Sequence, residues 1–173
     1  MTVLVAVASK YGSTREIGQA IAEELRASDV DADLRDAGDV TSLDGYEAVV
    51  LGSAVYMGNW LEAVKELAHR QAASLAARPT WLFSSGPIGG KPMPDEAVDV
   101  SAIVEATRAR GHRLFGGKLE RHRLGFAERA LTLALRIPEG DFRDWDEIRA
   151  WARHIASSVA SDSSSLPSPT TGC

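Results

Sequence analysis

Six consecutive residues near the N-terminus have the types and the order that suit anion binding. They combine three serine and threonine hydroxyls with a lysine, a tyrosine and a glycine: Ser9, Lys10, Tyr11, Gly12, Ser13 and Thr14. The segment joins an apolar run to a stretch of helical periodicity, and backbone N–H groups at a helix start are unpaired and lie at the positive end of the helix dipole. We therefore predict a site for a phosphate monoester. The alternative is a turn in which Ser13 or Thr14 only caps the helix.

Two other phosphate motifs are excluded. The stretch Gly86–Lys91 (GPIGGK) looks like a P-loop, but that motif requires glycine at Ser85 and serine or threonine at Pro92. No Gly-x-Gly-x-x-Gly follows the first apolar run, so a dinucleotide cradle is not expected. A cofactor of the mononucleotide type fits the loop better.

The elements that position this loop alternate between short apolar runs and helical periodicity. We predict five strands, at Thr2–Ala8, Asp31–Arg35, Ala48–Ser53, Thr80–Ser85 and His112–Leu119. We predict one helix that starts at Ser13 or Thr14, and three further helices over Asn59–Ala77, Val98–Arg110 and Asp144–Ala160. This alternation predicts an α/β fold, a three-layer sandwich around a five-stranded parallel sheet of order 2-1-3-4-5. Ligands of such sheets bind beyond the strand carboxyl ends, between the first and third strands.

Composition limits the function further. The 173 residues fit one domain over 1–160, followed by a Ser/Pro-rich tail over 161–173 that we interpret as disordered. A net charge of −5 argues against nucleic-acid binding. The single cysteine excludes a disulfide within the chain, and the scattered histidines do not predict a metal site. No apolar run is long enough to span a membrane and no secretory leader is visible, so we expect a cytoplasmic protein.

Two further loops fall at the same edge of the predicted sheet. Gly52–Trp60 (GSAVYMGNW) follows the third strand and Ser84–Gly89 (SSGPIG) follows the fourth. The first loop, Ser9–Thr14, resembles the flavodoxin phosphate loop, Ser/Thr-x-Thr-Gly-x-Thr, with Tyr11 in place of the middle threonine. The other two stand where flavodoxins place the loops that flank their flavin. The chain is thus similar to the flavodoxin superfamily over about Thr2 to Ala156.

Within that superfamily the chain most resembles the branch that contains menaquinone-dependent protoporphyrinogen oxidase. That branch has an inserted segment after the fifth strand and a closing Asp-Trp helix, which here reads Asp144–Ala152 (DWDEIRAWA). The resemblance implies non-covalently bound FMN, or a deazaflavin of the F420 type, held by the phosphate loop and two ring-flanking loops. The ring-flanking candidates are Val55, Tyr56, Met57, Gly58, Asn59, Ser85, Gly86, Pro87, Ile88 and Gly89. Trp60 is either a ring contact or a core residue, and no side chain is assigned a catalytic role.

A basic and apolar segment, about 120–142, is predicted to be inserted before the final helix. Six basic residues and one acidic residue lie between Arg108 and Arg123, and Leu124–Ile137 (LGFAERALTLALRI) has a wide apolar arc at helical spacing. One interpretation is that residues 120–137 dock on an anionic membrane or a partner, or admit a lipophilic oxidant such as a quinone. The other is a helix packed between the sheet and the final helix.

We therefore expect a flavin-dependent oxidoreductase that passes electrons to a quinone or a protein acceptor. The branch resemblance adds a tetrapyrrole as a candidate substrate, with Arg121 and Arg123 as candidate contacts for its propionates. The alternatives are an electron carrier without catalytic activity and an interaction module without a cofactor. Acidic residues around the ring would favour the carrier, and they are sparse: Glu62, Asp95 and Glu96.

Overall fold

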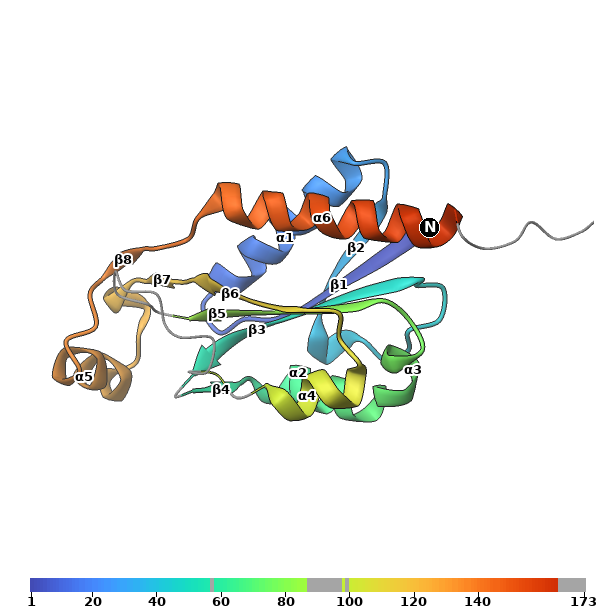
Figure 1. Cartoon of the computed structure of the whole chain (residues 1–173). Helices are drawn as coiled ribbons and strands as arrows, with labels where there is room; N and C mark the ends of the chain where they lie inside the picture. Colours follow the sequence, from blue (N-terminus) through green and yellow to red (C-terminus); the bar gives the residue numbers. More distant parts are fainter. Residues whose placement is uncertain (57, 87–97, 99, 165–173) are drawn as a thin grey trace, which may run out of the picture.

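The computed structural model describes residues 1–56, 58–86, 98 and 100–164. It has three layers, a central sheet with helices on both faces (Figure 1). The central strands are β1 (Thr2–Ala8), β2 (Asp31–Asp36), β3 (Ala48–Tyr56), β5 (Thr80–Gly86) and β6 (His112–Gly116). They are all parallel, in the order β2-β1-β3-β5-β6, with Val3 opposite Ala48 and Val49 opposite Thr80. The predicted fold class and strand order are therefore confirmed.

The helices divide between the two faces of the sheet. The elements α1 (Ser13–Ala27) and α6 (Trp145–Ser164) cover one face, while α2 (Glu62–Arg70), α3 (Ala72–Ala76) and α4 (Ser101–Thr107) cover the other (Figure 1). Strand β1 is apolar throughout because its alternate residues enter different cores. Val3, Val5 and Val7 pack toward α1 and α6, and Leu4 and Ala6 toward the other layer.

An aromatic cluster fills the core under α6. The rings of Phe83, Phe115 and Trp151 lie with their centroids 5.6–6.1 Å apart in tilted or edge-to-face pairs. Gly52 on β3 leaves space for this cluster, because a Cβ atom there would lie 2.1 Å from the Phe83 ring.

Two predicted helices differ from the structure. Asn59–Trp60 form a short strand, β4, which pairs antiparallel with the end of β3, so the predicted helix Asn59–Ala77 begins at Glu62 instead. The same helix is interrupted at Gln71 before α3. Helix α4 is shorter than the predicted Val98–Arg110, because Arg108 adopts a left-handed conformation with φ of 50°. The apolar periodicity continues across these breaks, which explains the longer predictions.

The inserted segment leaves the sheet after β6. The predicted strand His112–Leu119 ends at Gly116, and β7 (Lys118–Leu119) pairs instead with β8 (Gly140–Asp141) in a separate antiparallel ladder. Between them lie a 3₁₀ turn (Arg121–Arg123) and helix α5 (Phe126–Ala134).

Helix α5 projects beyond the carboxyl ends of the strands and does not lie between the sheet and α6 (Figure 1). The interpretation as a packed core helix is therefore wrong. At the other end of the chain, α6 continues to Ser164, so residues 161–164 of the predicted tail are helical. The remainder of that tail, 165–173, is outside the described residues.

Candidate functional site

A cavity of about 200 Å³ lies at the carboxyl ends of β1, β3 and β5, beneath the inserted segment. Its walls bring together nine predicted site residues: Ser9, Lys10, Tyr11, Ser13, Thr14, Val55, Tyr56, Ser85 and Gly86. The insertion supplies further walls through Leu119, Leu124, Glu128, Leu131, Thr132, Leu135 and Ile137. The loops that follow three different strands thus converge on one space, as expected at the reversal point of this sheet.

The loop after β1 has the geometry of an anion cradle. Gly12 has a φ of 90°, a left-handed conformation that glycine adopts without strain, and its N–H donates to Ser9 Oγ at 3.0 Å. Helix α1 starts at the next residue, and neither Ser13 nor Thr14 caps it with a side-chain hydrogen bond. The prediction that one of these residues is the cap is therefore wrong. Instead, the helix start remains open toward the cavity.

Thr14 carries a buried polar atom without a partner. Its side chain is completely buried, and Oγ1 has no hydrogen-bond partner among the residues that the structure describes. Leaving a buried hydroxyl unsatisfied costs about 1–3 kcal/mol, so such atoms often mark a ligand. Because Thr14 also lines the cavity, its hydroxyl fits an anion held at the start of α1.

The loops after β3 and β5 are partly described. Tyr56 is 40% exposed at the cavity edge, and Lys10 Nζ lies 4.6 Å from the centre of its ring. Gly58 and Asn59 lie in the turn and in β4, outside the lining of the cavity as far as the described chain defines it. Four predicted ring-flanking residues lie outside the described residues: Met57, Pro87, Ile88 and Gly89.

The two alternatives for Trp60 are resolved in favour of the core. Its side chain is buried, and Nε1 donates to Ser84 Oγ at 2.7 Å. The Ser84 hydroxyl also lies 2.7 Å from His112 Nε2, and the Trp60 and His112 rings are 6.5 Å apart. This polar chain connects β4, β5 and β6 and holds Trp60 in the core.

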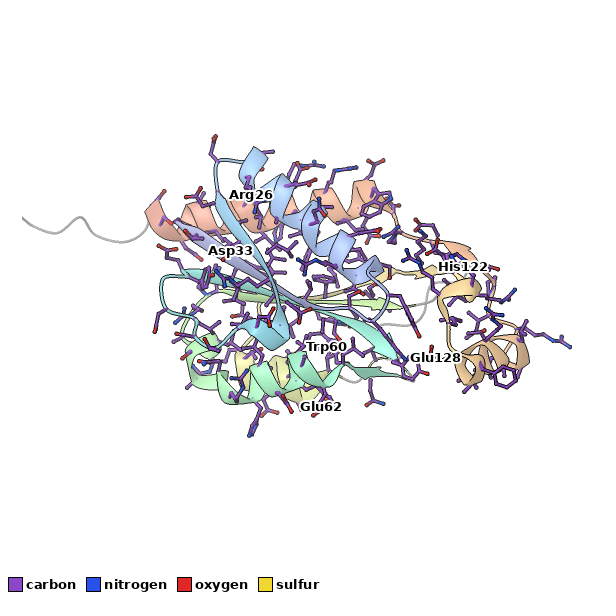
Figure 2. All side chains as sticks on the ribbon, turned by 180° about the vertical axis from the view of Figure 1, so that it is seen from behind. Arg26, Asp33, Trp60, Glu62, His122 and Glu128 are labelled. Atoms are coloured by element: carbon purple, nitrogen blue, oxygen red, sulfur yellow. The ribbon has the colours of Figure 1, made fainter. Side chains whose placement is uncertain are left out.

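The insertion contributes a residue that the sequence analysis did not include in the site. Glu128 on α5 points toward the ends of the sheet strands (Figure 2). Its Oε1 accepts a hydrogen bond from Lys10 Nζ and its Oε2 accepts one from the Tyr11 hydroxyl. The Gly125 N–H also donates to Oε2, at 3.3 Å. Glu128 stands four residues before Thr132 and both line the cavity, whereas Arg129 and Arg136 of the same polar arc are exposed.

These contacts shift the pKa values of the groups involved. Hydrogen bonds from Lys10 and then Tyr11 lower the pKa of Glu128 to about 2. The hydrogen bond with Glu128 is also the main reason that the pKa values of Lys10, Tyr11 and Tyr56 are raised. The cluster therefore contains a carboxylate, an ammonium group and two neutral phenols at neutral pH.

Arginine side chains attach the insertion to the rest of the fold. Arg123 Nη1 donates to the Tyr11 carbonyl at 3.0 Å, and Arg121 Nη2 donates to the Ile137 carbonyl at 2.8 Å. The largely buried Arg143 pairs with Asp141 at 2.6 Å and with Glu16 on α1. Arg121 and Arg123, which the sequence analysis considered for substrate propionates, thus already hold backbone carbonyls of the insertion and of the loop.

Comparison with known proteins identifies a family. The model of the flavodoxin domain family matches residues 4–144. Protoporphyrinogen IX dehydrogenase [quinone] of Escherichia coli strain K12 is 23% identical over 172 residues, which cover 90% of this chain and 95% of that protein.

Solved structures show the same fold. A flavodoxin from the domain Archaea has a TM-score of 0.62 at 18% identity, over 92% of this chain and 99% of that one. A Streptococcus pneumonia TIGR4 flavodoxin has a TM-score of 0.59 at 16% identity, over 94% and 99%. The strand order, the converging loops and the family match agree: this chain belongs to the flavodoxin domain family, whose fold implies a flavin cofactor.

Proposed function

We propose that the chain binds FMN non-covalently and acts as an oxidoreductase that delivers electrons to a quinone. The observation that carries the cofactor assignment is the completely buried Thr14 hydroxyl, which lacks a partner in the described structure and lines the cavity. A terminal phosphate offers several acceptor oxygens to that hydroxyl and to the unpaired N–H groups at the start of α1.

The remaining residues divide between phosphate and ring. Ser9, Ser13 and Thr14 would hold the phosphate, and the described parts of the two ring loops, Val55–Tyr56 and Ser85–Gly86, would flank the ring. FMN, when bound, supplies electron transfer in steps of one or two electrons. The apolar walls of the cavity would keep water away from the ring.

Titration of the purified protein with FMN tests the cofactor assignment. We expect quenching of flavin fluorescence at micromolar protein, with riboflavin binding much more weakly because it lacks the phosphate. F420 serves as the second chromophore in the same titration, since a deazaflavin has the same ring shape. If neither FMN nor F420 binds, the proposal is refuted and the chain has a flavodoxin fold without its cofactor.

The insertion favours an enzyme over a simple electron carrier. Leu124, Leu131, Leu135 and Ile137 extend the apolar wall beyond the three loops of the sheet. This extension offers an apolar surface to a lipophilic second reactant, whereas a carrier needs only an exposed ring edge. The quinone-linked relative in Escherichia coli supports the same choice, with protoporphyrinogen as the candidate electron donor.

Steady-state oxidation of protoporphyrinogen with menadione as acceptor separates the two functions. An enzyme gives a rate that saturates with the tetrapyrrole, while a carrier gives no dependence on it. Truncating Leu131 and Leu135 together to alanine removes apolar wall from the insertion, so the KM for menadione is expected to rise several-fold. Unchanged KM in that variant would argue against a quinone site under α5.

We also propose a location at the cytoplasmic surface of an anionic membrane. The outward side of α5 exposes Phe126 (92%) and Leu133 (55%), and Arg129 and Arg136 are exposed beside them. Apolar and cationic side chains together match the chemistry of an anionic lipid surface. None of the described helices is long and apolar enough to cross the bilayer, so the proposed contact is peripheral.

A further inference from the structure

The cluster around Glu128 has the donors of an anion-binding site. Lys10 and Tyr11 donate to the two carboxylate oxygens, and the ring of Tyr56 lies 4.6 Å from Lys10 Nζ. Both donors come from the loop after β1, and the acceptor comes from α5, 117–118 residues later in the chain. The donors of the site therefore come from the loop at the edge of the sheet, and the carboxylate that fills the site comes from the insertion.

The occupant shares its chemistry with the proposed ligand. An ionised carboxylate and a phosphate ester are both anions that only accept hydrogen bonds, and both form strong charge-assisted bonds with ammonium and hydroxyl donors. The Glu128 cluster and the unpartnered Thr14 hydroxyl line the same cavity. A phosphate bound at Thr14 would thus bring negative charge close to the Glu128 carboxylate, and like charges at short range repel.

The size of the cavity leads to the same conclusion. Its volume of about 200 Å³ is below the roughly 300–1,000 Å³ of small-molecule sites. A mononucleotide with a three-ring chromophore therefore requires a wall to move. The sheet strands are held by hydrogen bonds to their neighbouring strands. Helix α5 exposes most of its apolar side chains, so it is the wall that loses the fewest packing contacts when it moves.

We propose that Lys10 and Tyr11 form an anion subsite which Glu128 fills in the free protein and leaves when a phosphate ester binds, so that ligand binding detaches α5 from the loop after β1. This inference rests on the proposed function, because it assumes that the ligand carries a phosphate. It assigns two roles to Glu128: it neutralises Lys10 in the free protein, and it closes the cavity until the ligand arrives.

Limited trypsin digestion measures the attachment of α5 directly. Arg123, Arg129 and Arg136 lie in the insertion and are exposed, so detachment increases cleavage there. Inorganic phosphate is the first probe, compared with chloride at equal ionic strength, and mass spectrometry identifies the cut sites. In the wild type, phosphate is expected to raise the cleavage rate several-fold. In Glu128→Gln, cleavage is expected to be fast with or without phosphate, and phosphate binding tighter.

Two further variants separate this mechanism from general loosening. Glu139→Gln removes the charge of another carboxylate of the insertion, which accepts from the Arg121 N–H at 3.1 Å and lies outside the subsite. This variant is expected to be cleaved faster but to keep its response to phosphate. Lys10→Met keeps the carboxylate and removes its cation, so cleavage is expected to be fast, as in Glu128→Gln, but phosphate binding is expected to be weaker than in the wild type. Thermal unfolding of each variant confirms that it is folded.

The outcomes for this inference and for the proposed function are distinct. If FMN binds but neither FMN nor phosphate changes the cleavage of the wild type, the displacement of Glu128 is refuted and the cofactor proposal stands. If phosphate accelerates cleavage of the wild type but not of Glu128→Gln, while FMN does not bind, the subsite is supported and the cofactor proposal fails. A phosphate response of equal size in Glu128→Gln would also refute the inference.

Discussion

Replacing Thr14 by valine tests whether its hydroxyl is reserved for a ligand. The two side chains are nearly equal in size, so the change removes a polar atom and creates little cavity. In the free protein that atom is completely buried, and no residue in the described chain bonds to it. The substitution should therefore have opposite effects on stability and on ligand binding.

The effect on stability follows from the cost of the unsatisfied hydroxyl. Burial without a partner costs about 1–3 kcal/mol, so Thr14→Val is expected to raise the free energy of unfolding of the ligand-free protein by about that amount. Urea denaturation, with fluorescence of the four tryptophans as the signal, measures the change. The slope of the transition should stay constant, because the surface exposed on unfolding is unchanged.

The effect on binding follows from the bond that the hydroxyl would make. A hydrogen bond to a charged group contributes about 1.5–3 kcal/mol, which corresponds to a roughly 10- to 150-fold increase in Kd when it is lost. Fluorescence titration with FMN measures this, and Thr14→Ser should retain most of the affinity because it keeps the hydroxyl.

Thr107 provides a matched control for the same substitution. It is also completely buried, but its hydroxyl donates to the Ile103 carbonyl at 2.7 Å. Thr107→Val is expected to lower stability by about 1 kcal/mol, since a satisfied hydrogen bond is lost, and to leave FMN affinity unchanged. If Thr14→Val behaves like Thr107→Val in both assays, the Thr14 hydroxyl has a structural role and the phosphate assignment is wrong.

Three other perturbations test the fold, the insertion and its surface. Gly52→Ala places a methyl group against the buried Phe83 ring and is expected to lower the free energy of unfolding by about 1–3 kcal/mol in urea denaturation; no loss would mean that the aromatic cluster can shift. The pKa of Glu128 is lowered to about 2, so the stabilisation from its contact with Lys10 is complete above the ordinary value of 4.5 and decreases as pH falls from there toward 2. Amide hydrogen exchange in α5, corrected for intrinsic rates, should accelerate over that range, and a flat profile would contradict the assignment. Phe126→Asp should co-sediment with phosphatidylglycerol vesicles much less than the wild type does, and phosphatidylcholine vesicles should bind neither the variant nor the wild type. Equal binding of the variant and the wild type to phosphatidylglycerol vesicles would exclude α5 as the membrane contact.

The arrangement of the sheet was predictable because it depends on local patterns. Continuous apolar runs such as Thr2–Ala8 mark strands buried on both faces, and their alternation with helical segments allows few connections. Once the strand order is known, the loop Ser9–Thr14 must lie beside the ends of β3 and β5. Nine predicted site residues lie around one cavity because the strand order brings their loops together.

The helical limits were harder to predict because apolar spacing continues where the backbone changes direction. Trp60 has the spacing of a helical core residue, but its indole N–H bonds to Ser84 across a short antiparallel pair. Ser13 and Thr14 have the residue types of a helix cap, yet Gly12 occupies the cap position and leaves the Thr14 hydroxyl without a partner in the described chain. Residue type determines which hydrogen bonds a side chain can form, and the neighbouring elements determine which of these hydrogen bonds are made.

By itself, the sequence determined the parallel sheet, the position of the loop Ser9–Thr14 and the existence of a basic, apolar insertion. Only the tertiary structure decided which way that insertion faces. At helical spacing Glu128 and Thr132 form a polar arc, and a polar arc ordinarily faces water. Here Lys10 and Tyr11, more than a hundred residues earlier, offer Glu128 charge-assisted hydrogen bonds, so Glu128 and Thr132 turn inward and Phe126 and Leu133 remain exposed. Periodicity describes one helix alone, whereas its orientation depends on partners that only folding brings near.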